Sequence, residues 1–381
     1  MQFLTFMNIY GIGAAALCLG IQDTVAGSDW PMYRGGPGLV GVASGRLPDA
    51  PALLWSFKTE GPVKSSAAVE GGKVYVGSDD GNVYALSLDN GKKVWAFKTG
   101  GPVESSPLVL QGKVFFGSTD ANLYAVDAAS GKQVWKYETG DKILSGPNWF
   151  QAPKATAPWI LVGSYDYKLH CLYSATGKTN WTYETGNYIN GSPAVADGKT
   201  VFGGCDAMVH VISLLDGQPL KEIEAGAYIA ASVAVVDNRA YFGHYENEVL
   251  CVDLAAGTVA WRYKDRPFAY FSSPAVIGDR VLVGGRDKRL HCLQKTDGKE
   301  FWAFSTRGKV DSSPVVCGDR VVVGSDDGRL YMVELSTGKE LWNYEIGKPI
   351  NASPAVVDGR IIIGSEDGSI YAFGPKEGGR R

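Results

Sequence analysis

The sequence lacks the closely spaced cysteines that indicate a disulfide framework or a metal site. Its six cysteines are scattered over 381 residues, and five of them, an odd number, lie beyond the apolar N-terminal segment. It also lacks an excess of charge, because 37 Lys and Arg oppose 40 Asp and Glu for a formal net charge of −3. A nearly neutral chain has no global electrostatic attraction to nucleic acid. We therefore expect neither a cysteine-based metal site nor nucleic-acid binding.

Catalytic signatures are missing as well. The sequence contains no serine-hydrolase motif, no Gly-rich phosphate loop and no zinc-binding helix. It therefore predicts no catalytic residue and no metal ligand.

Apolar runs long enough to span a bilayer do not occur after residue 27. Before it, IYGIGAAALCLGI is followed by the small residues VAG, which is the pattern of a secretory signal peptide over residues 1–27. No Lys or Arg precedes the apolar stretch, so a retained anchor helix and a misassigned start codon are the alternatives. We expect an exported chain that begins near Ser28 and has no membrane span.

Glycine and aromatic residues, by contrast, are abundant. The 49 glycines are nearly twice the average share of about 7%, and they accompany 10 Trp, 19 Tyr and 14 Phe. This composition is typical of many short strands joined by tight turns.

One tryptophan position recurs about every 40 residues, in most repeats four residues after a glycine. Lys221 stands where a further tryptophan is expected, and the longest interval contains six extra residues near 151–158. A repeat of this length is typical of a propeller blade. A blade cannot bury its faces alone, so we interpret the tryptophans as structural docking residues against the neighbouring blade. These residues are Trp55, Trp95, Trp135, Trp181, Trp261, Trp302 and Trp342.

Each repeat contains four short segments of alternating aliphatic residues, which predict four antiparallel strands. Eight sets of first to third strands begin near residues 65, 105, 145, 191, 231, 272, 312 and 352. The last set has no fourth strand after it, whereas LLWSFKT at 53–59 is a fourth strand with no set before it. We predict an all-β, eight-bladed propeller over residues 52–375, closed by this N-terminal strand, with seven blades as the alternative. Residues 28–51 form an N-terminal extension and 376–381 a C-terminal tail.

Polar residues that recur once per blade are interpreted as structural. An Asp in the turn between the second and third strands hydrogen-bonds its own backbone, and equivalent positions in different blades do not converge on one metal ion. The turn carboxylates are Asp80, Asp120, Asp166, Asp206, Glu246, Asp287, Asp327 and Asp367. The third-strand positions hold His170, His210 and His291, followed by Cys171, Cys251 and Cys292 at the neighbouring position.

The repeats LYAVDAASGKQVW (123–135) and LYMVELSTGKELW (330–342) resemble the tryptophan-docking repeat of the pyrroloquinoline quinone (PQQ) family. The resemblance covers roughly residues 52–375. It implies a periplasmic or secreted bacterial protein, and it extends to two functional groups. One group is the PQQ-dependent alcohol and sugar dehydrogenases. The other is the non-catalytic eight-bladed propellers, such as the scaffold lipoprotein of outer-membrane protein assembly.

Departures from the dehydrogenase pattern favour the non-catalytic group. Adjacent cysteines, a CxxCH haem motif and the long loops that build the quinone and calcium sites of the dehydrogenases have no counterpart in this sequence. We therefore predict no cofactor. A small PQQ-dependent dehydrogenase, with PQQ and calcium, is the alternative.

The loops on one face depart from the repeat in blades 3 to 6, and propeller function tends to lie in such loops. Aromatic residues together with Arg are typical of recognition surfaces, although solvated loops with shielding aromatic side chains are the alternative. We predict a monomer that binds a protein or envelope polymer through this face. The candidate binding residues are Tyr165, Tyr167, Tyr188, Asn190, Tyr228, His244, Tyr245, Arg266, Tyr270, Arg286 and Lys288, with Lys168 and Phe271 beside them.

Overall fold

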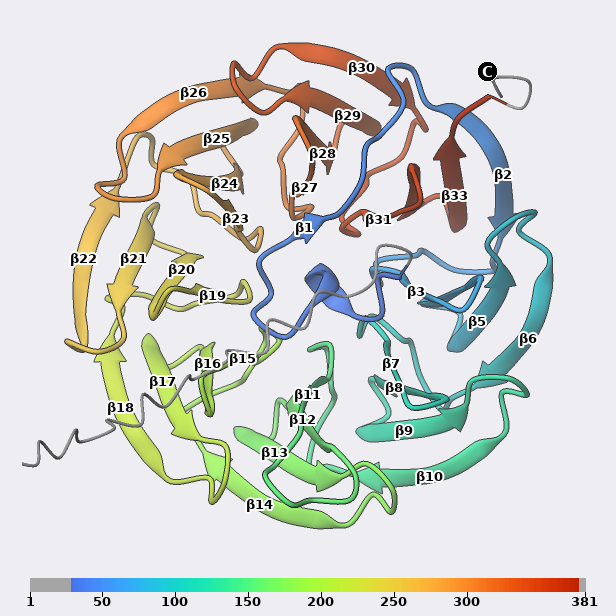
Figure 1. The fold of residues 1–381 in the computed structure, drawn as a ribbon, viewed down its shortest axis with the longest axis vertical. Coiled ribbons are helices and arrows are strands. Elements are labelled where there is room, and N and C mark those ends of the chain that lie inside the picture. Colours follow the sequence, from blue (N-terminus) through green and yellow to red (C-terminus); the bar gives the residue numbers. More distant parts are fainter. Residues whose placement is uncertain (1–28, 377–381) are drawn as a thin grey trace, which may run out of the picture.

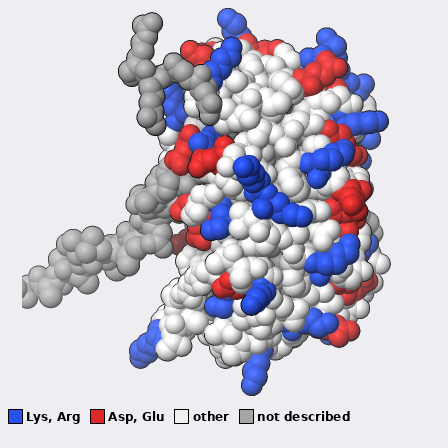
Figure 2. All heavy atoms as spheres, turned by 90° about the vertical axis from the view of Figure 1, so that its right-hand side faces the viewer, with Lys and Arg blue, Asp and Glu red and all other residues white. Residues whose placement is uncertain are grey.

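Eight four-stranded antiparallel sheets form a ring around a central channel in the computed structural model, which describes residues 29–376 (Figure 1). This confirms the predicted eight-bladed propeller. The predicted signal peptide lies outside the described residues. Within the part of the chain that is described, no helix is long and apolar enough to cross a bilayer. On the side of the ring that Figure 2 shows, acidic and basic side chains are interspersed rather than gathered by sign.

The strands of the first four blades follow one another along the chain. Blade 1 comprises β3 (Ala68–Glu70), β4 (Lys73–Gly77), β5 (Asn82–Ser87) and β6 (Lys93–Lys98). Blade 2 comprises β7 (Leu108–Leu110), β8 (Lys113–Gly117), β9 (Asn122–Asp127) and β10 (Gln133–Glu138). Blade 3 comprises β11 (Asn148–Phe150), β12 (Trp159–Gly163), β13 (Lys168–Tyr173) and β14 (Thr179–Glu184). Blade 4 comprises β15 (Ala194–Ala196), β16 (Lys199–Gly203), β17 (Met208–Ser213) and β18 (Pro219–Glu224).

The remaining blades keep this order until the last. Blade 5 comprises β19 (Ala234–Val236), β20 (Arg239–Gly243), β21 (Val249–Asp253) and β22 (Thr258–Tyr263). Blade 6 comprises β23 (Ala275–Ile277), β24 (Arg280–Gly285), β25 (Arg289–Gln294) and β26 (Glu300–Ser305). Blade 7 comprises β27 (Val315–Cys317), β28 (Arg320–Gly324), β29 (Arg329–Glu334) and β30 (Glu340–Glu345). Blade 8 comprises β31 (Ala355–Val357), β32 (Arg360–Gly364), β33 (Ser369–Gly374) and, as its outer strand, β2 (Ala52–Lys58).

The ring is closed by the two ends of the chain. Strand β2 pairs antiparallel with β33, with Ser56 opposite Tyr371 and Lys58 opposite Ser369. The N-terminal strand therefore completes the last blade, as predicted from the sequence. Because β2 is the fourth strand of blade 8, no blade is left with three strands and an unpaired third strand where the ring closes.

The apolar core lies between neighbouring blades rather than at the centre of the ring. One cluster joins Tyr75 and Val83 of blade 1 to Phe116 and Val126 of blade 2. The channel itself is lined by the first strand of each blade, which is a sheet edge. Such an edge carries backbone groups that need hydrogen-bond partners.

A segment preceding β2 supplies partners to these inner edges. We call residues 29–49 the channel segment; it contains η1 (Tyr33–Gly35) and β1 (Val42–Ala43), and it crosses the centre of the ring in Figure 1. Strand β1 runs parallel to β27. Carbonyl groups of the segment accept backbone hydrogen bonds of 2.7–3.0 Å from the first strands of six blades, at Val69, Val109, Val195, Val235, Val276 and Val316.

The channel segment lies at one end of the channel. That end carries the turns between the first and second strands, because the Asp29 carboxylate accepts a hydrogen bond of 3.3 Å from Gly71 in the turn between β3 and β4. We call it the closed end. The open end carries the loops that enter each first strand and the turns between second and third strands.

Six of the seven docking tryptophans lie against a glycine turn of the following blade. The Trp95 indole N–H donates to the Ala128 carbonyl at 3.1 Å, and its ring lies so close to Gly131 that a Cβ there would approach it to 2.7 Å. Gly131 also has a φ of 71°, which favours glycine. Where Lys221 replaces tryptophan, its ammonium group donates to the Ala255 carbonyl instead. Trp342 faces the chain ends of blade 8 and packs on Phe373, with ring centroids 5.6 Å apart.

We predict that Trp95→Ala lowers the free energy of unfolding by about 3–5 kcal/mol, since it removes a large buried aromatic side chain. Lys221→Ala at the equivalent position should cost less than about 1 kcal/mol, because the lysine is only half-buried and keeps its ammonium at the surface. Urea denaturation of both variants measures the difference. Equal losses would contradict the assignment of Lys221 to the docking position.

Candidate functional site

The turn aspartates hold the open end of seven blades together, whereas in blade 5 the Glu246 carboxylate, expected to act in the same way, accepts no hydrogen bond from the described residues. In blade 2, the Asp120 carboxylate accepts hydrogen bonds from the backbone of Asn122 at 3.0 Å, the Tyr124 hydroxyl at 2.7 Å and the backbone of Gly100 at 2.7 Å. Burial raises the pKa of Asp120, but these hydrogen bonds lower it by more. Turn stability accounts for the recurrence of this carboxylate.

In three blades a histidine stands in place of the third-strand tyrosine that donates to this carboxylate. The aromatic residue on the other side of the imidazole ring then changes as well. His170 contacts Asp166 through Nε2 at 3.0 Å and the Tyr137 hydroxyl through Nδ1 at 3.1 Å. A tyrosine has one hydroxyl and needs one partner, so Tyr124 is accompanied by Phe97, with ring centroids 5.4 Å apart. An imidazole has two nitrogen atoms and needs a second polar partner. The remaining two trios of this kind are Tyr183–His210–Asp206 and Tyr263–His291–Asp287.

Blade 6 contains a group of three potential metal ligands, Asp265, Asp287 and His291, whose ligand atoms lie within 4.8 Å of one another. Arg289 lies inside this group, with Nη1 2.5 Å from Asp265 and 3.9 Å from Asp287. The guanidinium already balances the carboxylates, so we interpret the cluster as an ion-pair network.

Glu300 joins this network through His291, at 2.9 Å from Nδ1. Burial lowers the pKa of His291, but its hydrogen bonds to Asp287 and Glu300 raise it by more. The hydrogen bond from His291 lowers the pKa of Glu300 to about 2, against the effect of burial. Glu300 therefore contributes stability that is present above its unfolded pKa of 4.5 and is lost as the pH falls towards 2.

We predict that Glu300→Gln reduces the loss of stability on acidification. The variant should be less stable than the wild type at neutral pH, and the two should converge as the pH falls through about 4.5 towards about 2. Urea midpoints across this range measure the effect. Glu340→Gln is the matched control, because Glu340 begins the outer strand of blade 7, where Tyr331 replaces the histidine. Parallel pH profiles for wild type and Glu300→Gln would contradict the assignment.

Aromatic side chains line one half of the open end. Tyr165 stacks on Tyr188 with ring centroids 4.6 Å apart, and Tyr167 contacts Tyr188 at 5.1 Å. In the next blades Tyr245 contacts Tyr228 at 6.3 Å and Phe271 at 4.4 Å. We call Tyr165, Tyr167, Tyr188, Tyr228, Tyr245 and Phe271 the aromatic arc.

A cation stands at each end of the aromatic arc. The Lys142 ammonium lies 4.4 Å from the centre of the Tyr165 ring, and the Arg286 guanidinium lies 3.8 Å from that of Phe271. Arg286 also forms two hydrogen bonds with Asp311, at 2.7 and 3.0 Å. These contacts hold the end residues of the arc in place.

The structure brings together some of the candidate binding residues and separates others. Tyr270 and His244 are buried, with 1% and 2% of their surface exposed, and Tyr270 packs on His291. Burial lowers the pKa of His244, and its Nδ1 accepts a backbone hydrogen bond from Glu246. Arg266 and Lys288 are exposed outside the arc. Asn190 lies in the channel, where its amide contacts the Cys205 sulfur at 3.2 Å.

At the open end, the channel widens into a cavity of about 170 Å³. Its floor is Tyr33 of the channel segment, whose hydroxyl lies 3.1 Å from Ser273 Oγ and 3.0 Å from Ser313 Oγ. Neither Tyr33 nor these serines were identified as site residues from the sequence. The recurrence of a Ser-Pro pair in five of the eight repeats is the signal from which their role could have been inferred.

A ring of serine side chains surrounds the cavity and links the blades; we call it the serine crown. The backbone N–H of one serine donates to the Oγ of the next, as from Ser192 to Ser232 at 2.7 Å and from Ser353 to Ser66 at 2.8 Å. Glycine replaces serine in blade 3, at Gly146. The serine crown consists of Ser66, Ser106, Ser192, Ser232, Ser273, Ser313 and Ser353.

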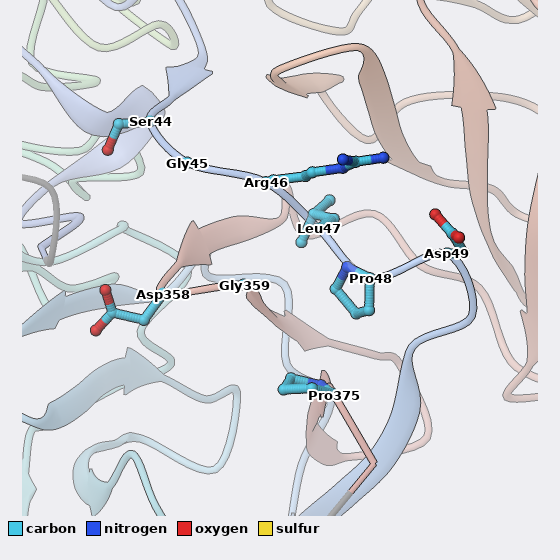
Figure 3. Close-up of a pocket in the computed structure, with 9 residues that line it drawn as sticks. All are labelled: Ser44, Gly45, Arg46, Leu47, Pro48, Asp49, Asp358, Gly359 and Pro375. Atoms are coloured by element: carbon cyan, nitrogen blue, oxygen red, sulfur yellow. The ribbon is translucent and has the colours of Figure 1, made fainter. Parts of the chain in front are cut away.

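A second hollow, of about 670 Å³, lies at blade 8, where the channel segment passes the C-terminal strands (Figure 3). It lies between Leu47 and Pro48 of the channel segment, the turn at Asp358 and Gly359, and Pro375. Blade 8 takes its third and fourth strands from opposite chain ends, so no turn joins them here. The hollow is therefore a consequence of ring closure.

Comparison with known proteins places this propeller in the PQQ-like class. The family model described as outer membrane protein assembly factor BamB matches residues 47–150, 145–264, 200–304 and 286–381. The chain belongs to this family. A search of curated protein sequences finds no significant match.

Solved structures share the fold at low sequence identity. BamB from Moraxella catarrhalis is 18% identical, with a TM-score of 0.70 over 87% of this chain and 99% of that one. The quinohemoprotein alcohol dehydrogenase from Comamonas testosteroni is 15% identical, with a TM-score of 0.77 over 91% of this chain and 80% of that one. The computationally designed Ika8 protein is 16% identical, with a TM-score of 0.75 over 85% and 99%. An assembly factor, an enzyme and a designed ring share this architecture, so fold alone does not assign function.

Proposed function

We propose that the chain is an exported, monomeric, non-catalytic scaffold that binds a partner protein through the aromatic arc. The observation that carries this proposal is the grouping of six aromatic side chains, four of them exposed, between Lys142 and Arg286 at the open end of the channel. Tyrosine and arginine are enriched among the residues that dominate protein interfaces. Membership of the BamB family supports a scaffold in the bacterial envelope, periplasmic or secreted.

The residues of the cavity do not fit the quinone that the dehydrogenase alternative requires. A volume of about 170 Å³ holds about five or six water molecules, whereas PQQ is a tricyclic tricarboxylate. The one cation in the lining is Lys64, which is already paired with Asp79 at 2.8 Å and Glu104 at 3.2 Å. We therefore assign no step to a quinone or to calcium.

We predict that the triple variant Tyr188→Ala, Tyr245→Ala and Arg286→Ala loses partner binding while the ring stays folded. Surface substitutions of this kind usually change stability by less than about 0.5 kcal/mol each. Affinity capture from envelope extract, with a photo-crosslinking residue at position 167, identifies the protein in contact with the arc. Thermal melts of the same samples show that folding is retained.

The matched control is the triple variant Tyr173→Ala, Phe301→Ala and Arg280→Ala near the closed end. Tyr173 and Phe301 are 41% and 44% exposed, as Tyr188 and Tyr245 are 38% and 45% exposed, and Arg280 stacks on Phe301 at 4.7 Å. The control should keep the partner. Retention of the partner by the arc variant, or binding of isolated envelope polysaccharide that the arc variant loses, would contradict the proposal. Dye reduction that depends on added PQQ and calcium would support the dehydrogenase instead.

A further inference from the structure

The serine-lined cavity below the aromatic arc offers more hydrogen-bonding groups than the protein itself satisfies. Each Oγ of the serine crown accepts a backbone N–H from the neighbouring blade, and the serines are all more than nine-tenths buried. Apart from the contacts of Ser273 and Ser313 with Tyr33, no acceptor for these hydroxyl groups lies within hydrogen-bonding distance among residues 29–376. The crown therefore directs unused donors into the cavity.

One unused acceptor belongs to the lining of the cavity, and another lies beside it. Asn351 lines the cavity, and its Nδ2 donates to Glu366 at 2.7 Å, but its buried Oδ1 has no partner among the described residues. Beside the cavity, Lys64 holds Asp79 by one oxygen, and the other oxygen, Oδ1, is also buried without a partner. A buried polar atom without a partner costs free energy, so a ligand that satisfies it gains affinity.

Apolar residues make up a small part of the cavity lining. Leu144, Ala230, Ala231 and Phe271 line it in blades 3, 5 and 6, where the aromatic arc begins. Gly146 stands where the other blades have serine, and Ser192 Oγ and the Ser106 carbonyl oxygen lie only 3.1 and 3.2 Å from where its Cβ would be. The surface that faces the cavity is mainly polar, with hydroxyl and amide groups around it.

Charge does not select the ligand. The two charged residues of the lining, Lys64 and Asp311, are both paired within the protein, Lys64 with Asp79 and Glu104, and Asp311 with Arg286. An anion would satisfy only the serine donors, and a cation would satisfy only the acceptors. A neutral ligand with several hydroxyl groups satisfies both, because each hydroxyl group donates and accepts.

We propose that the cavity binds one pyranose-sized ring of a neutral carbohydrate. The hydroxyl groups of the sugar exchange hydrogen bonds with the serine crown and Asn351. The volume of about 170 Å³, equal to about five or six water molecules, suits a single ring. This inference goes beyond protein binding by the aromatic arc, and it concerns a different set of residues.

The test is calorimetry and ligand-observed NMR on the folded protein with methyl glycosides of glucose, galactose, mannose and N-acetylglucosamine. We expect saturable binding of at least one glycoside at one site per chain. Asn351→Ala should weaken it about fivefold to tenfold, as expected for one lost hydrogen bond. Ala230→Phe should abolish it by filling the cavity. Inorganic phosphate and spermidine, as probes for an anion and a cation site, should not bind.

Matched controls separate the cavity from the rest of the surface. Asn90→Ala and Ala129→Phe make the same exchanges at exposed turns of the closed end and should leave binding unchanged. Tyr188→Ala, which weakens the aromatic arc, should also keep the sugar, so failure of the protein-binding proposal would not remove this site. If the Ala230→Phe variant does not melt cooperatively, it is not folded, and the effect of Asn351→Ala alone tests the inference.

Three results would overturn the inference. The first is that none of the glycosides binds the folded wild type, which would mean that the cavity holds water only. The second is that phosphate or spermidine binds in place of the glycosides. The third is that glycoside binding is unchanged in Asn351→Ala or in a folded Ala230→Phe protein.

Discussion

Pairing of β2 with β33 is the interaction on which the rest of the ring depends. A four-stranded blade cannot bury its faces alone, and each blade here packs on two neighbours only if the ring is complete. The outer strand of blade 8 comes from the N-terminal part of the chain, so the chain must pass from the channel to the rim before blade 1 begins. The docking tryptophans make each blade depend on its neighbour in the same way, since each tryptophan contacts the blade that follows.

This path distinguishes the two ends of the channel. Residues 29–49 cover the closed end and provide carbonyl acceptors for the inner strands of six blades. Tyr33 then forms the floor of the cavity, and the serine crown links the blades directly above it. The loops at the open end do not have to provide these carbonyl acceptors. Their departure from the repeat in blades 3 to 6 is therefore compatible with a stable ring, and it is there that the aromatic arc lies.

The repeat made most of the fold predictable from the sequence. A position such as Trp95 recurs because its surroundings recur, and the unmatched strand at 53–59 sufficed to predict how the ring closes. The turn carboxylates were interpretable for the same reason, because Asp120 acts within its own turn and the adjoining loop.

Features that depend on a single, non-repeated contact were not predictable. Tyr33 belongs to a segment with no counterpart elsewhere in the chain, and its contacts with Ser273 and Ser313 span 240 and 280 residues. Tyr270 and Tyr245 both appear as loop tyrosines in the sequence, yet Tyr270 is buried against His291 and Tyr245 is exposed in the arc. The direction of a loop side chain is set by such packing rather than by local pattern.

Amide hydrogen exchange of the inner strands tests most directly whether the channel segment closes one end of the ring. The account predicts that the amides of Val109, Val195, Val235 and Val276 exchange slowly, because each donates to a carbonyl of residues 31–40 at 2.7–2.9 Å. The loops of the aromatic arc, such as residues 226–228, should exchange much faster. Inner-strand amides that exchange as rapidly as these loops would show that the closed end is open in solution, which would contradict the account.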